Sequence, residues 1–590
     1  MARALIPFGL FILVALIPAT GNAYLVYFVF AILVSFILAQ SWDWIAGEAG
    51  LINLGHYVFF GIGAYTFSIG VINDLPIALC FVFAAGFTSL VAAILGIPLF
   101  RLTGDYFAFA TLALLPLAEL LASNLASITG GSDGIPLPPG GGMVFGFEVK
   151  TVAYYMALVF AVGAIVVTMW ITRSPFGYAL KAVRNDEEAA EILGVRIFPA
   201  KIRALVLSAL AASLAGSVYA WSFRYIDPST VFGLNSALLP VAMALLGGSG
   251  LLWGPLIGVL LLSVAQQLLL TNLTILQATI YGLVILFIGR YMPGGLLRAA
   301  SIRRLPGLKA LGREHHEYLT ERGPSPTMAA VKEIALRRYA TERDGPLLVC
   351  DGVTMAFGGN VAVNGVSLSI DKGEIIGLIG PNGSGKTTFF NCISKVYEPV
   401  AGRIILDGHD LGGVSRYRVS RLGVGRTYQI PRPFQDLTVV ENIAIPLMFR
   451  ERDSLPLRRA FVEAGDFASF AGLEDHLDVR ADLLSLQHKK ALEFARALAC
   501  KPKLLLLDEV ASGLTPAEVK RFVAQIRHVR DAFGLTVIWV EHIISALSLV
   551  VDRIVVMEEG ATIADGNLRE VMKDEKVLKT YLGTVSKEAG

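Results

Sequence analysis

The sequence predicts a multi-domain protein, in which an α-helical polytopic membrane domain of about ten transmembrane helices is followed by an α/β domain with a phosphate-binding loop. The first observation behind this prediction is an uneven distribution of charge, because residues 1–300 hold only 12 of the 50 basic and 12 of the 48 acidic side chains. That half is too apolar for a soluble domain, whereas the rest has an ordinary composition. The second observation is a glycine-rich loop at 380–387, which follows an apolar strand and precedes a helical pattern.

The composition excludes several classes of protein. A chain of 590 residues with 54% hydrophobic side chains, distributed in this way, is not a secreted, disordered or purely soluble protein. The net charge of +2 gives no electrostatic reason to expect a nucleic-acid partner. The four cysteines are scattered, without a paired metal spacing or a disulfide framework, so we expect buried thiols in a reducing compartment.

The apolar half divides into ten candidate spans, because a spanning helix needs roughly 20 mostly apolar residues. The first span could pass for a cleaved signal peptide, but further spans follow at once and we expect it to be retained. The eighth is short and ends in glycines, which is also consistent with a broken helix. The predicted spans are 5–20, 23–43, 51–73, 75–100, 106–127, 151–172, 204–222, 236–249, 252–270 and 274–289.

Positive charge indicates the orientation of these spans. The connection at 173–203 carries six basic residues, and more follow the last span, which marks both regions as cytoplasmic. The loop at 128–150 is rich in glycine and proline and has one basic residue, so we expect it outside. Ten spans place both ends of the membrane domain inside, in agreement with these charges.

Two features of the membrane half allow two interpretations each. Glu119 is a carboxylate within a predicted span, which is either a functional group or a hydrogen-bonded structural one. Residues 173–196 mix charged residues with alanine and leucine at helical spacing. That pattern suits a surface that docks a soluble partner, and it equally suits a solvated loop helix.

The domain boundaries follow from composition. Residues 1–297 form the predicted membrane domain, with membrane lipid around it. The stretch 298–346 is charged, contains prolines and lacks sustained periodicity, so we interpret it as a linker. We expect the α/β domain at 347–583 and a short tail at 584–590.

The loop at 380–387 carries the clearest chemistry in the chain. Its glycines allow backbone N–H groups to converge on phosphate oxygens, where a Cβ atom would intrude. Lys386 is expected to neutralise the β- and γ-phosphates of ATP, and the Thr387 hydroxyl is expected to ligate Mg2+. The expected ATP-binding residues of this segment are Gly380, Pro381, Asn382, Gly383, Ser384, Gly385, Lys386, Thr387 and Thr388.

Four further residues are expected to complete a hydrolytic site. A buried strand ends in Asp508 and Glu509, which we assign to the magnesium shell and to the attacking water, respectively. Gln429 lies between the two motifs, at a place suited to contact the metal or the water. His542 follows a second apolar strand, where it can contact the γ-phosphate. The predicted catalytic residues are therefore Glu509, His542 and Gln429, and the predicted magnesium ligands are Thr387, Gln429 and Asp508.

The order of these motifs resembles the ATP-binding-cassette (ABC) ATPases across about 347–583. The resemblance implies hydrolysis of ATP with Mg2+, and it assigns Phe357 as the aromatic residue that stacks on adenine. It also assigns Ser485 and Gln487 to the signature region, which in this family faces the ATP bound by a partner cassette. The family has a glycine where this chain has Gln487. In the segment known in the family as the D-loop, Thr515 stands at the position of the family's usual polar residue.

More narrowly, the chain resembles a fusion of two subunits of branched-chain amino acid importers. The segments similar to the LivG-type ATPase are 426–429, 437–442 and 512–518. The segments similar to the LivM-type permease are 52–56, 59–66, 101–106, 129–134, 173–180 and 246–255. This resemblance favours the coupling interpretation of 173–196.

The resemblance implies the permease and ATP-hydrolysing subunit of an importer in the bacterial inner (plasma) membrane, with its ATPase domain in the cytoplasm. The implied partners are a second permease of the LivH type, a second ATPase of the LivF type and a periplasmic solute-binding protein. We expect branched-chain amino acids to be the cargo. The alternative is urea, short amides or small aromatic acids, which similar permeases transport. Gln487 leaves a further alternative, which is a regulatory or scaffold subunit with low turnover.

Overall fold

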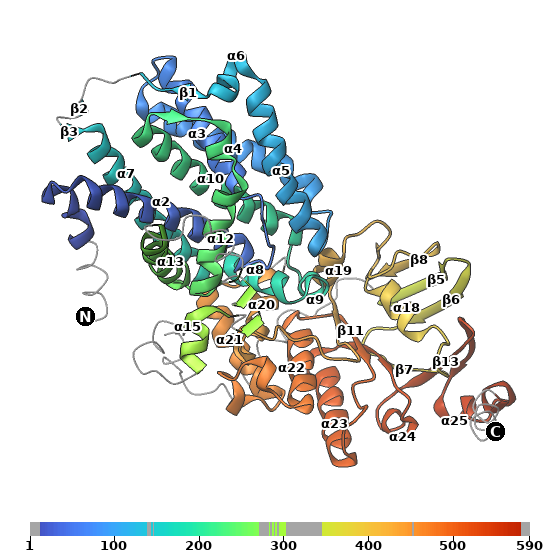
Figure 1. The fold of residues 1–590 in the computed structure, drawn as a ribbon. Helices are drawn as coiled ribbons and strands as arrows, with labels where there is room; N and C mark the ends of the chain where they lie inside the picture. The colour runs from blue at the N-terminus through green and yellow to red at the C-terminus, as the bar shows by residue number, and fades with distance from the viewer. Residues whose placement is uncertain are drawn as a thin grey trace. The chain divides into compact units, whose positions relative to one another are not determined.

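The chain divides into two compact units in the computed structural model (Figure 1). The membrane unit contains residues 1–184 and 198–315, and the C-terminal unit contains 316–590 together with 185–197. The structure describes residues 12–138, 143–144, 147–270, 283, 286–287, 290–291, 294–302, 345–450 and 454–579. Most of the predicted linker and the whole predicted tail lie outside the described residues.

The described part of the membrane unit is built mainly from helices (Figure 1). Its longer helices are α2 (Ala23–Ala46), α3 (Tyr57–Ile72), α4 (Ile77–Leu99), α5 (Asp105–Asn124), α7 (Val149–Thr172), α8 (Pro175–Asn185), α10 (Ile197–Phe223), α12 (Leu234–Gly247), α13 (Gly254–Leu270) and α15 (Gly295–Ile302). Its short elements are η1 (Ile17–Thr20), α6 (Ala126–Thr129), η2 (Gly131–Asp133), α11 (Pro228–Val231), a β1 (Ile135–Pro136)–β4 (Tyr225–Ile226) pair and a β2 (Met143–Val144)–β3 (Phe147–Glu148) pair.

These helices confirm the predicted helical membrane domain. Within the described residues, six helical segments are long and apolar enough to cross a membrane, namely 23–46, 77–99, 105–124, 149–172, 197–223 and 228–247. Two shorter apolar helices, α3 and α13, coincide with two more predicted spans. The first predicted span lies partly, and the last one largely, outside the described residues, so the count of ten stays a prediction. On α4, Phe83, Phe87 and Leu90 are more than half exposed, which suits contact with lipid.

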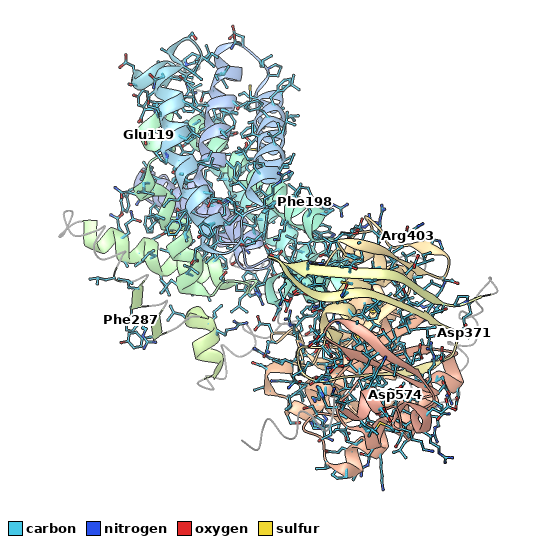
Figure 2. The ribbon with its side chains drawn as sticks, turned by 90° about the vertical axis from the view of Figure 1, so that its right-hand side faces the viewer. Glu119, Phe198, Phe287, Asp371, Arg403 and Asp574 are labelled. Atoms are coloured by element: carbon cyan, nitrogen blue, oxygen red, sulfur yellow. The ribbon has the colours of Figure 1, made fainter. Side chains whose placement is uncertain are left out.

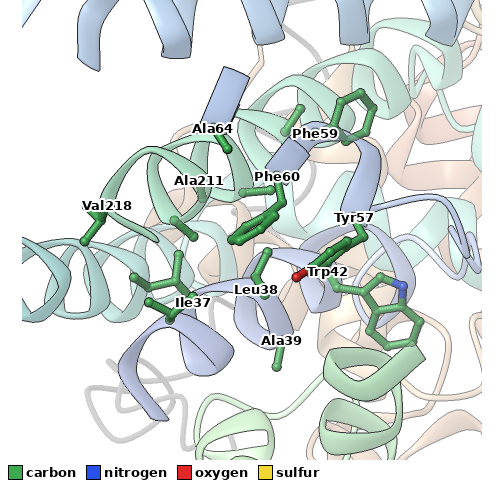
Figure 3. Close-up of a cluster of buried hydrophobic side chains, with 14 of the residues drawn as sticks. Ile37, Leu38, Ala39, Trp42, Tyr57, Phe59, Phe60, Ala64, Ala211 and Val218 are labelled. Carbon is green, nitrogen blue, oxygen red and sulfur yellow. The ribbon is translucent and has the colours of Figure 1, made fainter. Parts of the chain in front are cut away.

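Small residues let α3 and α10 approach at backbone distance. A Cβ atom added to Gly63 would lie 2.4 Å from the backbone of Ser213, and one added to Gly216 would lie 2.0 Å from the Phe60 carbonyl oxygen. This close packing is the role that small residues commonly have between membrane helices. Aromatic side chains of α2 and α3 fill the adjacent core (Figure 3). The indole N–H of Trp42 donates to the Asn53 carbonyl oxygen at 2.8 Å.

Within its described residues, the C-terminal unit contains two sheets. The six-stranded sheet has the order β10 (Val424–Arg426), β11 (Leu504–Asp508), β12 (Thr536–Val540), β7 (Ile375–Ile379), β13 (Arg553–Glu558), β14 (Ala561–Gly566). The four-stranded antiparallel sheet has the order β6 (Asn360–Ile370), β5 (Leu348–Phe357), β8 (Ala401–Leu406), β9 (His409–Asp410). The helices are α9 (Glu187–Ile192), α18 (Lys386–Ile393), α19 (Arg416–Leu422), α20 (Val439–Phe449), α21 (Leu457–Phe470), α22 (Leu486–Ala499), α23 (Pro516–Phe533), α24 (Ile544–Leu547) and α25 (Leu568–Val571), with 3-10 turns η5 (Glu474–His476) and η6 (Ala481–Leu483).

The central strands position the candidate site. Every residue of β7, β11 and β12 is buried, as expected for apolar strands covered on both faces of a parallel sheet. In the register, Asp508 lies opposite Val540, and Val540 lies opposite Leu378. The carboxyl ends of the three strands are therefore level, and ligands of open parallel sheets bind at that edge.

Candidate active site

The glycine-rich loop connects β7 to α18 in a conformation that requires glycine. Gly380, Gly383 and Gly385 all have positive φ angles. A Cβ atom at Gly380 would lie 2.2 Å from the Met557 carbonyl oxygen, and one at Gly385 would lie 2.2 Å from that of Ala362. The backbone is thus free to expose its N–H groups along the loop. Of the other loop residues, Ser384 is buried, Pro381 and Thr388 are half-buried, and Asn382 and Thr387 are exposed.

Lys386 is held inside this loop. Its side chain is 6% exposed, and its Nζ atom donates to the carbonyl oxygens of Gly380 and Pro381, both at 2.8 Å. Burial lowers the pKa of Lys386, while the neighbouring carboxylates of Glu509 and Asp508 act in the opposite direction. The ammonium group therefore lies where phosphates bind in loops of this sequence.

Asp508 has a carboxylate oxygen that is available to bind a ligand. The residue is 2% exposed, and its Oδ1 atom is buried without a hydrogen-bond partner in the described part of the chain. Its Oδ2 atom lies 3.7 Å from Nη2 of Arg426. Burial raises the pKa of Asp508, and Arg426 counteracts that rise. A buried carboxylate oxygen without a partner fits a hard cation such as Mg2+, and the exposed Thr387 hydroxyl on the first turn of α18 is chemically suited to join it.

The structure brings the three predicted catalytic residues together. Gln429 donates from Nε2 to Oε2 of Glu509 at 2.6 Å, and Nε2 of His542 lies 2.8 Å from Oε1 of the same carboxylate. Glu509 has a φ of +45°, a strained conformation for a residue other than glycine that is common at functional sites. Both oxygens of the Glu509 carboxylate are therefore oriented by side chains from two other loops.

Phe357 ends β5 and is 42% exposed, so its ring is open to a ligand. Tyr397 packs edge-on against it, with ring centroids 5.0 Å apart. Sequence reasoning missed Tyr397, because no motif surrounds it and its nearness to Phe357 depends on the fold.

Ser485 and Gln487 lie at the start of α22. Ser485 is the N-cap residue, whose Oγ atom accepts the His488 N–H at 3.3 Å. Both Ser485 and Gln487 are exposed. This exposure suits contact with a second molecule, and their role toward a partner's ATP stays a prediction.

Two buried charged residues that support the site were also missed by sequence reasoning. Glu541 is 1% exposed and accepts the Ala511 N–H at 2.6 Å, which fixes the segment after Glu509. Burial raises the pKa of Glu541. Arg426 ends β10 and is 4% exposed. A charged residue at the end of a buried strand is the signal that could have identified each of them.

The segment Asn185–Ile197 forms ion pairs within the C-terminal unit. On α9, Glu188 Oε2 lies 3.1 Å from Arg432 Nη1, and Glu191 Oε2 lies 3.8 Å from Arg416 Nη1. This segment therefore docks acidic side chains on two arginines, of which Arg432 lies three residues after Gln429 in the sequence. The coupling interpretation of 173–196 stays a prediction.

The membrane unit holds a buried polar cluster that sequence reasoning did not predict. Asp43 of α2 is 2% exposed; it accepts the Ser249 hydroxyl at 2.5 Å and the Gly250 N–H at 2.9 Å. Arg184 donates to the carbonyl oxygen of Gly47, one turn further along the chain from Asp43. These bonds join the end of α2 to the turn between α12 and α13 and to the end of α8. Glu119, singled out from the sequence, lies half-buried on α5 (Figure 2).

Comparisons with known proteins cover both units. Residues 24–289 match the family model described as the branched-chain amino acid transport system / permease component, and residues 363–512 match the ABC transporter model. The C-terminal region is 36% identical over 250 residues to the high-affinity branched-chain amino acid transport ATP-binding protein BraF of Pseudomonas aeruginosa, covering 40% of this chain and 98% of the relative. It is also 36% identical over 250 residues to LivG of Escherichia coli strain K12, with the same coverage of both chains. A crystal structure of an ATP-binding cassette of an ABC transporter in its ADP conformation has 28% identity and a TM-score of 0.37, covering 41% of this chain and 100% of that one.

Proposed function

The chain belongs to the ABC transporters, as a permease component and a LivG-type ATP-binding protein in one polypeptide, and on that premise we propose that it imports branched-chain amino acids at the expense of ATP. It is a membrane-bound transporter subunit with a cytoplasmic ATPase domain. The observation that carries the proposal is the joint presence of the permease match and of the Gln429–Glu509–His542 cluster beside a phosphate-binding loop.

ATP binds at the loop in this proposal. Its phosphates contact the loop N–H groups and Lys386, and its adenine stacks on Phe357. Thr387, Asp508 and Gln429 would hold Mg2+, which supplies charge neutralisation between the β- and γ-phosphates when bound. Asp508 is suited to this task because one of its buried oxygens has no hydrogen-bond partner among the residues that the structure describes.

Glu509 acts on the attacking water. The water oxygen attacks the γ-phosphorus, the bond to the β–γ bridging oxygen breaks, and Glu509 accepts the proton that the water loses. Gln429 and His542 each hold one oxygen of the Glu509 carboxylate, so the base cannot rotate away from the water. We propose that His542 also contacts the γ-phosphate.

The coupling step uses the segment 185–197. This segment is paired with arginines of the C-terminal unit, and it is covalently continuous with α8 and α10 of the membrane unit. A movement of the C-terminal unit on ATP binding would therefore pull on two helices of the membrane unit at once. Hydrolysis resets the cycle.

Membership of this family implies further subunits and a binding protein. We propose that they are a second permease of the LivH type, a second ATPase of the LivF type and a periplasmic solute-binding protein. Ser485 and Gln487, exposed at the start of α22, would face the ATP held by the second ATPase.

Uptake by the complete complex in vesicles tests this function. With ATP inside, we expect labelled leucine, isoleucine or valine to accumulate, and urea, short amides and small aromatic acids to accumulate poorly. Selective accumulation of urea, a short amide or a small aromatic acid would support the importer function but contradict the proposed cargo.

A second candidate function is suggested by Gln487, whose exposed side chain occupies the expected contact surface for a partner's phosphate. In that case the chain is a regulatory or scaffold subunit with little turnover. Strong stimulation of ATP hydrolysis by the solute-loaded binding protein, lost on Glu509→Gln, would exclude this alternative.

A further inference from the structure

Two guanidinium groups lie over the ring of Tyr428, the residue that precedes Gln429. The Cζ atom of Arg426 is 5.2 Å from the ring centroid, and that of Arg432 is 4.8 Å from it. Both distances are within the range of a cation–π interaction. The Tyr428 hydroxyl is buried, and within the described ranges it has no hydrogen-bond partner, so these contacts of the side chain are made by its ring.

Arg426 connects this stack to the proposed magnesium ligand. Its Nη1 atom donates to Asn391 Oδ1 at 2.6 Å and to Ser394 Oγ at 2.7 Å, while its Nη2 atom lies 3.7 Å from Asp508 Oδ2. Asn391 belongs to α18, the helix that begins with Lys386 and Thr387. The guanidinium group therefore fixes Asp508 relative to the phosphate-binding helix.

Arg432 connects the stack to the coupling segment. Its Nη1 atom lies 3.1 Å from Glu188 Oε2 and 3.7 Å from Asp186 Oδ2. Its backbone is held separately, because its N–H donates to Glu493 at 3.1 Å and its carbonyl accepts from Arg496 at 2.8 Å. With the backbone fixed in this way, the position of the Arg432 side chain depends on the acids of 185–197.

We propose that Arg432, Tyr428 and Arg426 form a positioning relay, through which docking of Asp186 and Glu188 sets the position of the magnesium-binding carboxylate of Asp508. The relay rests on the proposed function, since it needs Asp508 to bind the metal and 185–197 to move with transport. None of the three residues contacts ATP in this account. Each one restrains the next by ring stacking or ion pairing, so loss of any contact loosens Asp508.

Binding of Mn2+ in place of Mg2+ tests the relay without relying on turnover. The full-length chain carrying Glu509→Gln is saturated with ATP, and free Mn2+ is followed by electron paramagnetic resonance. We expect Tyr428→Leu to raise the Mn2+ dissociation constant about fivefold, the size of one lost cation–π contact of intermediate strength. Tyr428→Phe keeps the ring and is expected to retain the original value. Arg426→Met is expected to raise it roughly tenfold, as for other residues that orient metal ligands.

The link to the coupling segment has its own matched pair of variants. Glu188→Gln removes an acid that pairs with Arg432, and Glu191→Gln removes an acid of the same helix that pairs with Arg416. We expect Glu188→Gln to weaken Mn2+ binding, with no further loss when it is added to Tyr428→Leu, and Glu191→Gln to have no effect. Equal Mn2+ affinities for Tyr428→Leu and Tyr428→Phe, or for Glu188→Gln and Glu191→Gln, would overturn the relay and leave the transporter function intact. A chain that binds no Mn2+ with ATP even before these substitutions would instead contradict the proposed ATP site.

Discussion

The nucleotide site of the C-terminal unit and the Asp43 cluster of the membrane unit are both buried and polar, but they differ in how far their groups are satisfied. Asp43 accepts hydrogen bonds on both carboxylate oxygens from Ser249 and Gly250. Asp508, in contrast, has a buried oxygen that no described residue meets with a hydrogen bond. A saturated polar cluster stabilises a fold, whereas an unsatisfied one in a sheet-end site has capacity left for a ligand. The difference indicates that the nucleotide site has a chemical role, whereas the Asp43 cluster contributes to packing.

Glu509→Gln gives the largest expected effect and acts on the nucleotide site alone. Loss of the general base is expected to slow hydrolysis roughly 10²- to 10⁴-fold, since that is the usual contribution of such a group. ATP binding is expected to persist, because the loop and Lys386 are untouched. Single-turnover phosphate release, with nucleotide binding as the control, measures this. A rate equal to that of the parent complex would remove Glu509 from the mechanism.

Gly47→Ala tests whether the Asp43 cluster is structural. The new Cβ atom would lie 2.2 Å from Asp43 Oδ1 and 2.5 Å from the Gly250 nitrogen, so we expect a loss of about 1–3 kcal/mol in the free energy of unfolding of the membrane unit. Gly163→Ala in α7 is the matched control, because its Cβ atom would meet nothing within 4 Å, and it is expected to be neutral or stabilising.

Thermal unfolding in detergent compares these two glycine variants. ATP affinity of the Gly47→Ala chain is expected to stay unchanged. If the two variants unfolded at the same temperature, the close packing around Asp43 would contribute nothing measurable.

Phe357→Ser gives the smallest expected effect. Stacking on a base contributes about 1–3 kcal/mol, so we expect the dissociation constant for ATP to rise roughly tenfold. Phe357→Tyr keeps an aromatic ring beside Tyr397 and is expected to bind ATP nearly as well as the parent chain. Fluorescence titration with ATP measures both variants. Equal affinities for serine and tyrosine at this position would exclude adenine stacking on Phe357.

Much of the fold was predictable because its signals are local in the sequence. The strand that ends at Asp508 and the strand before His542 are continuous apolar runs, and both occur as predicted, as β11 and β12. The four cysteines are buried and free, again as expected. Parallel strands that end at the same edge of the sheet bring Gln429, Glu509 and His542 together. The order of the motifs along the sequence can indicate this arrangement.

The contacts that escaped prediction join residues far apart in the sequence. Asp43 stands at the end of a predicted span, and nothing near it indicates Ser249, which is 206 residues away. Arg432 and Glu188 are 244 residues apart. Neither pair belongs to a motif, so side-chain packing in the folded chain is what reveals them. The same holds for Tyr397 beside Phe357.

The most direct test of the account is simultaneous measurement of solute uptake and phosphate release by the complete complex in vesicles, with Lys386→Ala in this chain. The account predicts that this variant loses both accumulation and solute-stimulated hydrolysis, whereas Lys573→Ala, which removes an exposed lysine of the same unit, retains both. Undiminished accumulation with Lys386→Ala would contradict the claim that ATP bound by this chain drives transport through its own membrane unit.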